Sequence, residues 1–236
     1  MSGTPEVLVA SDQSVLVRFG AKIDPEIHAK VRGLVAAVDL ERPSWLVDVV
    51  PAYASALVSF DPLAIAAEEV KGWLVTQLAR AGGSDQASRA LRVPVWYDPA
   101  VAPDLVDVAR LRCLSVDEVI EIHASREYLV YMLGFKPGFP YMAEVDERLA
   151  TPRLAAPRLA VPVGSVAIAG RQTGIYPVTC PGGWRVIGRT PLSIFDPNRE
   201  QPFLFRPGDH VRFVPVDRAR FREIEADQGS WKEVAQ

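Results

Sequence analysis

The most constraining feature of the sequence is a glycine- and proline-rich stretch late in the chain. Residues 169–191 read AGRQTGIYPVTCPGGWRVIGRTP, with five glycines and three prolines around isolated polar side chains. Each glycine costs conformational entropy on folding, so a chain that needed only a regular sheet would not accept so many. The stretch therefore indicates tight turns between short strands, where polar groups can converge on a small-molecule pocket. The alternative is a set of barrel corners whose polar side chains satisfy buried backbone groups.

Length and composition favour a globular protein. The chain has 236 residues, of which 49% are hydrophobic, and a formal net charge of −3. That charge disfavours a nucleic-acid partner, which needs concentrated positive charge. We see no secretory signal and no apolar run near the ~20 residues of a membrane span. The cysteines, Cys113 and Cys180, lack the spacing of a metal or redox site. We therefore expect a cytoplasmic protein without a metal, membrane or nucleic-acid partner.

The first part of the chain predicts a small α/β domain over residues 1–86. Helices are expected after Asp24-Pro25 and after Asp61-Pro62, because Asp caps a helix and Pro fits its first turn. The order strand-strand-helix, twice, predicts a sheet covered on one face by two helices. The expected strands are residues 6–10, 14–19, 45–50 and 55–60.

A linker is expected at residues 81–88, and residues 87–236 form the second domain. Short strands separated by turn signals predict that this domain is a β-barrel or sandwich. A helix should begin near Ser115, because Ser115 and Glu118 have capping-box spacing. A short helix is expected between residues 217 and 226. The expected strands are residues 91–97, 127–133, 165–170, 184–189 and 209–216. The fold class is therefore α+β.

Two features of this domain could carry chemistry. His123 lies on the apolar face of the helix that starts near Ser115, and spacing alone favours a core histidine with one hydrogen-bond partner. The alternative is a proton shuttle that works near neutral pH. The loop GFKPGFPY, residues 134–141, presents aromatic side chains either as the wall of a site or as a hydrophobic plug. We interpret Cys180 as an inert thiol rather than a nucleophile.

Several arginines flank the glycine-rich stretch. Residues 151–165 contain Pro-Arg pairs and predict an extended strap, because proline fixes φ and removes a donor. Arg153 and Arg158 are interpreted as solvated, with an acidic ligand or partner as the alternative. Arg185 and Arg189 are four residues apart in a predicted strand and should therefore share a face.

Four motifs occur in order: YMLGFKPGFPYM at 131–142, TPRLAAPRLAVPVGSVAIAGRQTGIYP at 151–177, CPGGWRVIGRTP at 180–191 and RPGDHVRFVPV at 206–216. Together they resemble the family of the 5-oxoprolinase B subunit. That family includes proteins called allophanate hydrolase subunit 1 and the kinase inhibitor KipI. The chain is also similar to one half of the carboxyltransferase domain of urea carboxylase.

The resemblance implies a small α/β domain followed by a cyclophilin-like β-barrel. It implies ATP-dependent opening of the 5-oxoproline lactam to glutamate, or hydrolysis of allophanate. It also implies a complex with a homologous larger subunit, of the type of the 5-oxoprolinase C subunit or allophanate hydrolase subunit 2, and in the 5-oxoprolinase case a third subunit. Because the sequence has no phosphate-binding loop, we expect ATP to be bound mainly by partner subunits. The alternative is a KipI-type regulatory module that inhibits a sensor histidine kinase.

The motif positions also imply site residues. His123 is expected to be the catalytic residue that transfers a proton. The expected substrate-binding residues are Gly134, Phe135, Pro137, Gly138, Phe139, Gln172, Thr173, Tyr176 and Arg189. Family members commonly carry serine at the position of Cys180, which implies that the thiol is not required.

Overall fold

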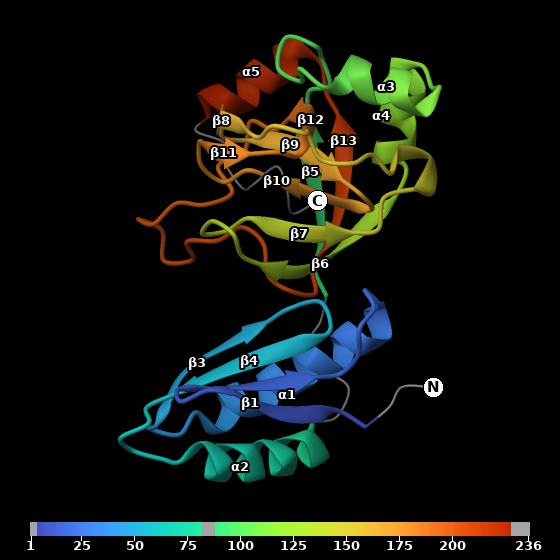
Figure 1. Cartoon of the computed structure of the whole chain (residues 1–236). Coiled ribbons are helices and arrows are strands. Elements are labelled where there is room, and N and C mark those ends of the chain that lie inside the picture. Colours follow the sequence, from blue (N-terminus) through green and yellow to red (C-terminus); the bar gives the residue numbers. More distant parts are fainter. Residues whose placement is uncertain (1–3, 82–87, 228–236) are drawn as a thin grey trace. The chain divides into compact units, whose positions relative to one another are not determined.

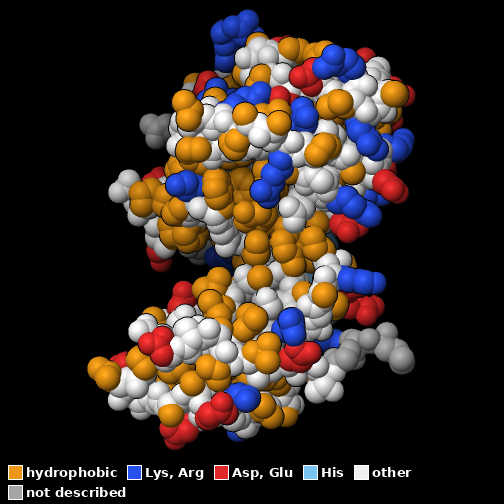
Figure 2. All heavy atoms as spheres, in the orientation of Figure 1, with side chains coloured by type: hydrophobic (Ala, Val, Ile, Leu, Met, Phe, Trp, Pro, Cys, Tyr) orange, Lys and Arg blue, Asp and Glu red, His pale blue; other side chains and the backbone are white. Residues whose placement is uncertain are grey.

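Two units with separate hydrophobic cores make up the chain, Met1–Ala87 and Ser88–Gln236 (Figure 1). The computed structural model describes residues 4–81 and 88–227. The predicted linker at 81–88 lies mostly outside the described residues. On the viewed face of the molecule, basic and acidic side chains are interspersed over both units (Figure 2). Within the described ranges, no helix is both long and apolar enough to cross a bilayer.

Unit 1, Met1–Ala87, contains the predicted sheet with two helices on one face (Figure 1). The antiparallel strands follow the order β1-β2-β4-β3. Val15, Val17 and Val58 alternate with more exposed residues along their strands and pack in one buried cluster with the helices. The elements are β1 (Glu6–Ser11), β2 (Ser14–Arg18), α1 (Pro25–Glu41), β3 (Leu46–Pro51), β4 (Ser55–Phe60) and α2 (Ala67–Arg80).

The helix starts of unit 1 confirm one prediction and correct another. Asp24 caps α1, since its Oδ1 accepts hydrogen bonds from the backbone N–H groups of Glu26 and Ile27 at 2.8 and 3.1 Å. The predicted start of α2 at Asp61-Pro62 is wrong. Asp61 instead closes a separate turn by accepting from the Leu63 N–H at 2.9 Å, and α2 begins at Ala67.

Unit 2, Ser88–Gln236, is built around a seven-stranded sheet that closes into a barrel. The strand order is β12-β9-β10-β7-β6-β13-β5, and all neighbouring pairs are antiparallel except β13 with β5. Just beyond β5, Trp96 exchanges two backbone hydrogen bonds with Arg189 of β12, at 2.8 and 3.0 Å. The two ends of the sheet therefore meet. The strands are β5 (Ala90–Val95), β6 (Glu127–Leu133), β7 (Pro140–Ala143), β9 (Ser165–Ala169), β10 (Gln172–Ile175), β12 (Arg185–Arg189) and β13 (His210–Pro215).

Helices and a small two-stranded sheet lie around this barrel (Figure 1). The capping box predicted for the helix near residue 115 is present: Ser115 Oγ accepts from the Glu118 N–H at 3.2 Å. The helix α3 was not predicted from the sequence. The elements are α3 (Leu105–Arg112), α4 (Val116–Ala124), the 3-10 helix η1 (Glu147–Leu149), the paired strands β8 (Arg158–Val161) and β11 (Cys180–Gly182), and α5 (Arg218–Ala226).

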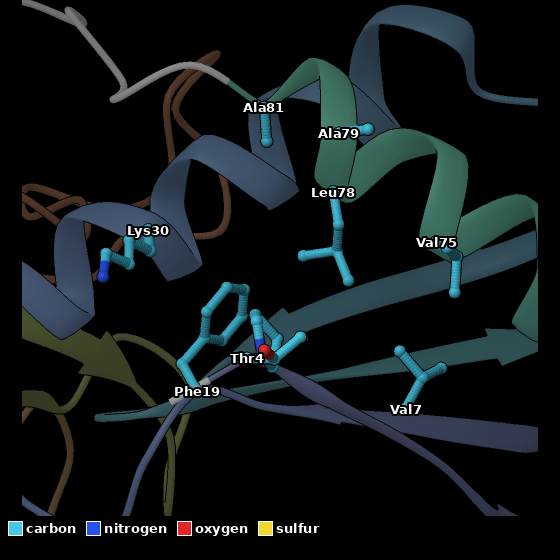
Figure 3. A pocket seen from close by; sticks show the side chains of 9 residues that line it. Thr4, Val7, Phe19, Lys30, Val75, Leu78, Ala79 and Ala81 are labelled. Carbon is cyan, nitrogen blue, oxygen red and sulfur yellow. The ribbon is translucent and has the colours of Figure 1, made fainter. Parts of the chain in front are cut away.

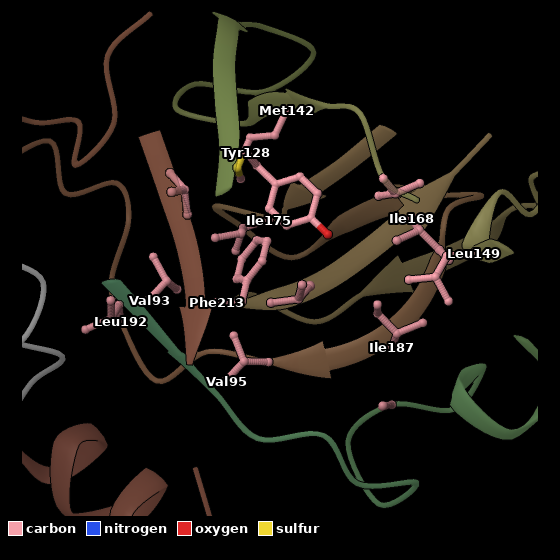
Figure 4. Packing of buried hydrophobic residues seen from close by; sticks show 14 of the residues in the cluster. Val93, Val95, Tyr128, Met142, Leu149, Ile168, Ile175, Ile187, Leu192 and Phe213 are labelled. Carbon is pink, nitrogen blue, oxygen red and sulfur yellow. The ribbon is translucent and has the colours of Figure 1, made fainter. Parts of the chain in front are cut away.

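The barrel interior is a packed hydrophobic core rather than a channel. Tyr128, Ile168, Ile175, Ile187 and Phe213 all point into it (Figure 4), and each is at most 1% exposed. The structure therefore confirms the α+β class with a barrel in the second unit. A site on this barrel must lie at its outer wall or its ends.

Candidate functional site

A second, smaller hydrophobic cluster lies on the outer face of the barrel wall. Ala167, Ala169 and Val186 belong to it, and they alternate along their strands with residues of the interior core. The two-stranded sheet of β8 and β11 contributes Val161 and Cys180, which belong to the same cluster. On the viewed face of unit 2, hydrophobic side chains gather over the region of β7, β10 and β11 (Figure 2).

A pocket of about 260 Å³ opens beside this outer cluster. It is lined by Phe135, Phe139, Tyr141, Arg153, Pro157, Tyr176, Pro181, Gly182, Gly183 and Trp184, and we call it the aromatic pocket. Apolar walls with a few convergent polar groups are typical of small-molecule sites. The glycine-rich stretch thus forms part of a cavity, as one of its two interpretations predicted.

Phe139 organises the walls of the aromatic pocket. Its ring makes edge contacts with Tyr141, Trp184 and Tyr176, at centroid distances of 4.9, 5.3 and 5.3 Å. Edge-to-face packing of this kind adds about 0.5–1.5 kcal/mol per pair beyond area burial and fixes ring orientation. The pocket is therefore held in shape by the outer cluster itself.

Two glycines of the stretch are needed because these rings lie directly against the backbone. A Cβ on Gly174 would stand 2.8 Å from the Phe139 ring, and a Cβ on Gly182 would stand 2.3 Å from the Tyr176 hydroxyl. Neither distance is possible for a real side chain. Because these two positions have no side chain, the Phe139 ring can lie against β10 and the Tyr176 ring against β11.

Phe135 forms the exposed rim of the pocket in a strained conformation. It has a φ of +61°, a region that costs a non-glycine residue about 1–2 kcal/mol, and it is 57% exposed. The surrounding loop enforces this geometry, since the Gly134 N–H donates to the Phe139 carbonyl at 3.1 Å. Such strain tends to persist at ligand-binding sites.

The polar groups of the pocket are two phenols and one guanidinium. Burial raises the pKa of Tyr141 and of Tyr176, and the charge of Arg153 opposes both shifts. Both hydroxyls therefore stay protonated near neutral pH. The Arg153 guanidinium carbon lies 6.0 Å from the centroid of the Trp184 ring, within cation–π range.

The structure brings some of the predicted substrate-binding residues to the aromatic pocket. Phe135, Phe139 and Tyr176 line it. Gly134, Pro137 and Gly138 belong to the same loop and shape it without lining the pocket: Gly138 has a φ of +82° and lies against Phe195 and Phe203. Gln172, Thr173 and Arg189 are not among the lining residues.

His123 lies in the barrel core, away from the lining of the pocket. It is 0% exposed, its ring stacks on Phe213 at 4.6 Å, and both ring nitrogens have protein partners. Nδ1 lies 2.7 Å from the Tyr97 hydroxyl, and Nε2 lies 3.0 Å from Thr173 Oγ1. Burial lowers the pKa of His123 to about 3. This geometry favours the core-histidine interpretation over the predicted proton transfer, with two hydrogen-bond partners rather than the one expected.

The tautomer of His123 follows from its partners. Thr173 Oγ1 donates its single proton to the Ala167 carbonyl at 3.1 Å, so it can only accept from the imidazole. Nε2 therefore carries the proton, and Nδ1 accepts from the Tyr97 hydroxyl. Thr173 serves this buried network rather than a ligand.

The other predicted polar residues also bind within the protein. Gln172 is half-buried in β10 between Ala143 and Ala169. Arg185 and Arg189 donate through Nε to the carbonyls of Pro152 and Val163, at 2.9 and 3.2 Å. A bulge between Val186 and Gly188 lies between the two arginines, and their guanidinium groups bond to different segments of the chain. That the two side chains share a face stays a prediction.

Arg158 is not the solvated side chain that the sequence suggested. Its guanidinium makes two hydrogen bonds of 2.8 Å to the carboxylate of Asp104, which is 2% exposed. Cys180 is 5% exposed, and burial raises the pKa of its thiol, which agrees with an inert cysteine. Within the part of the chain that the structure describes, no three His, Cys, Asp or Glu side chains gather as metal ligands.

Trp184 was not among the predicted site residues. Tyr141 entered only through one of the two interpretations of the 134–141 loop, and Arg153 only through the alternative of an acidic ligand or partner. All three lie within the motifs that carry the family resemblance, and Trp184 follows the Gly182-Gly183 pair directly. A large aromatic residue after two glycines was the available signal, because such a ring can pack closely against backbone only where glycine precedes it.

A second cavity lies in unit 1 and has a different character. Its volume is about 560 Å³, and Phe19 and Leu78 point into it (Figure 3). Its lining is apolar except for Thr4 and Lys30. Because polar groups do not converge there, the aromatic pocket is the better candidate for a small-molecule site.

Comparison with known proteins places this geometry in a family. The family model described as carboxyltransferase domain, subdomain C and D, matches residues 5–205. The chain is 38% identical over 233 residues, 94% of each chain, to a protein named as the B subunit of 5-oxoprolinase from Bacillus subtilis (strain 168). Among solved structures it is similar to TTHA0988, with 39% identity and a TM-score of 0.78, and the match covers 87% of this chain but only 40% of that one. The urea carboxylase of Kluyveromyces lactis, 21% identical over 97% of this chain and 23% of its own with a TM-score of 0.77, shares the fold. The match over residues 5–205 shows that the chain belongs to the carboxyltransferase family of subdomains C and D, and it confirms the family resemblance seen in the motifs.

Proposed function

We propose that this chain is a subunit of an ATP-dependent amidohydrolase complex that acts on a small carboxylated amide, with 5-oxoproline as the first candidate and allophanate as the second. The support is the relative named as the B subunit of 5-oxoprolinase, which matches over 94% of each chain. In this proposal the aromatic pocket binds the amide acid, and the active site is completed by a homologous larger subunit.

The observation that carries the proposal is the combination of groups in the aromatic pocket. The aromatic lining suits a planar amide: Phe135 is its exposed ring, and Phe139 and Trp184 are nearly buried behind it. The protonated hydroxyls of Tyr141 and Tyr176 are hydrogen-bond donors. A donor held beside the amide oxygen would stabilise the negative charge that develops there. His123 takes no part, because it is neutral and enclosed in the barrel core.

The aromatic pocket does not fit ATP. Its volume of about 260 Å³ lies below the usual range for larger ligands, about 300–1,000 Å³. It offers a single lining cation, Arg153, where a triphosphate needs several positive groups or a nest of backbone donors. In our proposal the partner subunits therefore bind the nucleotide, and this chain binds and orients the acid.

The test is reconstitution. The chain is co-expressed with the larger subunit and the third subunit from the same genome, and glutamate formation from 5-oxoproline is measured with and without ATP. We expect ATP-dependent turnover, and we expect Tyr176→Phe to lower kcat/KM about tenfold or more through loss of a positioned donor. The control is Tyr53→Phe, which changes a tyrosine of unit 1.

Two outcomes would contradict the proposal. An assembled complex that turns over neither 5-oxoproline nor allophanate would exclude it. If such a complex fails while the chain alone inhibits a sensor histidine kinase, the regulatory alternative is favoured.

A further inference from the structure

The aromatic pocket has a one-sided charge. Its ten lining residues include one cation, Arg153, and no carboxylate. Lys136, in the rim loop, adds a second positive charge: its Nζ lies 5.9 Å from the centroid of the Phe135 ring, which lines the pocket. A cavity lined by one sign of charge and by apolar walls favours a ligand of the opposite sign.

Arg153 differs from every other arginine of the strap and the glycine-rich stretch. Arg158 is paired with Asp104, Arg171 with Glu144, and Arg185 and Arg189 with backbone carbonyls. Across residues 4–81 and 88–227, neither an ion pair nor a hydrogen bond joins Arg153 to a protein acceptor. Its hydrogen-bonding capacity is therefore available to a ligand.

The position of Arg153 suits a carboxylate. Its guanidinium carbon lies 6.0 Å from the centroid of the Trp184 ring, within cation–π range, and the residue is exposed, so its donors can reach a ligand at the mouth of the pocket. The planar fork of arginine matches a carboxylate with two parallel hydrogen bonds, which a lysine cannot reproduce. Tyr141 and Tyr176 line the same pocket as Arg153, so the cavity holds this guanidinium together with two phenols.

We propose that Arg153 binds the carboxylate of the ligand and makes the aromatic pocket selective for small planar anions over neutral amides of the same shape. Trp184 positions the guanidinium, and the aromatic walls receive the planar part of the ligand. The identity of that ligand as an amide acid rests on the proposed function, whereas the anion selectivity of the pocket does not.

The test measures binding to the full chain by calorimetry, without partners or ATP. The probes form two matched pairs, 5-oxoproline with 2-pyrrolidinone, and benzoate with benzamide. Each pair differs by the presence of a carboxylate. The variants are Arg153→Gln, Arg153→Lys and the control Arg110→Gln, which removes the same charge from an exposed arginine of α3.

We expect each carboxylate to bind the wild-type chain at least tenfold more tightly than its neutral partner. Arg153→Gln should reduce this preference to less than threefold, Arg153→Lys should give an intermediate value, and Arg110→Gln should leave it unchanged. Binding of benzoate without binding of 5-oxoproline would support the anion site and count against the proposed substrate. If neither carboxylate binds, or if Arg153→Gln leaves the preference intact, the assignment is wrong.

Discussion

At the scale of single residues, His123 shows how burial decides what an ionisable group can do. The imidazole is 0% exposed and its pKa falls to about 3, so it is neutral in the folded protein near pH 7. In the unfolded chain its pKa returns to about 6.5. Below pH 6.5 the unfolded state therefore binds more protons than the folded state, so the contribution of His123 to stability is complete above that pH and is lost as the pH falls toward 3.

His123→Phe isolates this effect. At pH 7 the variant should lose about 1–3 kcal/mol of unfolding free energy, because the buried Tyr97 hydroxyl loses its acceptor. Between pH 7 and pH 5 the gap between wild type and variant should shrink by about 2 kcal/mol, since only the wild-type unfolded state gains this proton. Tyr97 and Tyr128 do not interfere, because burial raises both pKa values. Urea denaturation at the two pH values measures the gap, and a gap that does not change with pH would show that His123 is not buried as a neutral group.

At the scale of elements, Asp104 joins three segments that are far apart in the sequence. One carboxylate, just before α3, accepts from the Val186 N–H at 2.7 Å and from both Arg158 amino groups. It thereby ties α3, the strap and β12 together. Asp104→Ala should cost about 2–4 kcal/mol of unfolding free energy, because Arg158 and the Val186 N–H lose their acceptor.

The matched control for Asp104→Ala lies on the same helix. Asp107 pairs with Arg110, and their side chains are 48% and 76% exposed. Exposed pairs contribute little, so Asp107→Ala should cost under about 1 kcal/mol. Urea denaturation of both variants compares the two pairs, and equal losses would show that the Asp104 carboxylate does not hold these segments.

Local patterns predicted the elements better than their connections. Asp24-Pro25 and the Ser115–Glu118 box gave two helix starts, because a cap needs only residues within one turn. Asp61-Pro62 failed, since an aspartate can equally close a short turn. The His123–Thr173 and Asp104–Arg158 contacts span 50 and 54 residues, and only tertiary packing sets such partners. The motifs predicted three lining residues of the aromatic pocket, Phe135, Phe139 and Tyr176. The sequence did not distinguish Arg153 from Arg158, because only the structure shows that Arg158 is paired with Asp104 and that Arg153 lines the pocket.

At the scale of the whole molecule, each unit has hydrophobic clusters of its own among the residues that the structure describes. The core of unit 1 runs from Val15 to Leu74, and the two clusters of unit 2 lie between Leu91 and Ile224. A unit with its own core can fold alone. The lining of the aromatic pocket lies between Phe135 and Trp184, entirely within unit 2.

These two facts predict that a fragment of residues 88–236 folds by itself and keeps the pocket. Its amide NMR spectrum should be dispersed, and its dissociation constant for benzoate should lie within twofold of that of the full chain, because every lining residue is present. The fragment carrying Arg153→Gln is the control and should lose the preference for benzoate over benzamide. A fragment that collapses without a dispersed spectrum would show that the barrel core needs unit 1, and would make the predicted domain boundary near residue 86 wrong. A folded fragment that binds benzoate at least tenfold more weakly would instead show that unit 1 contributes to the site.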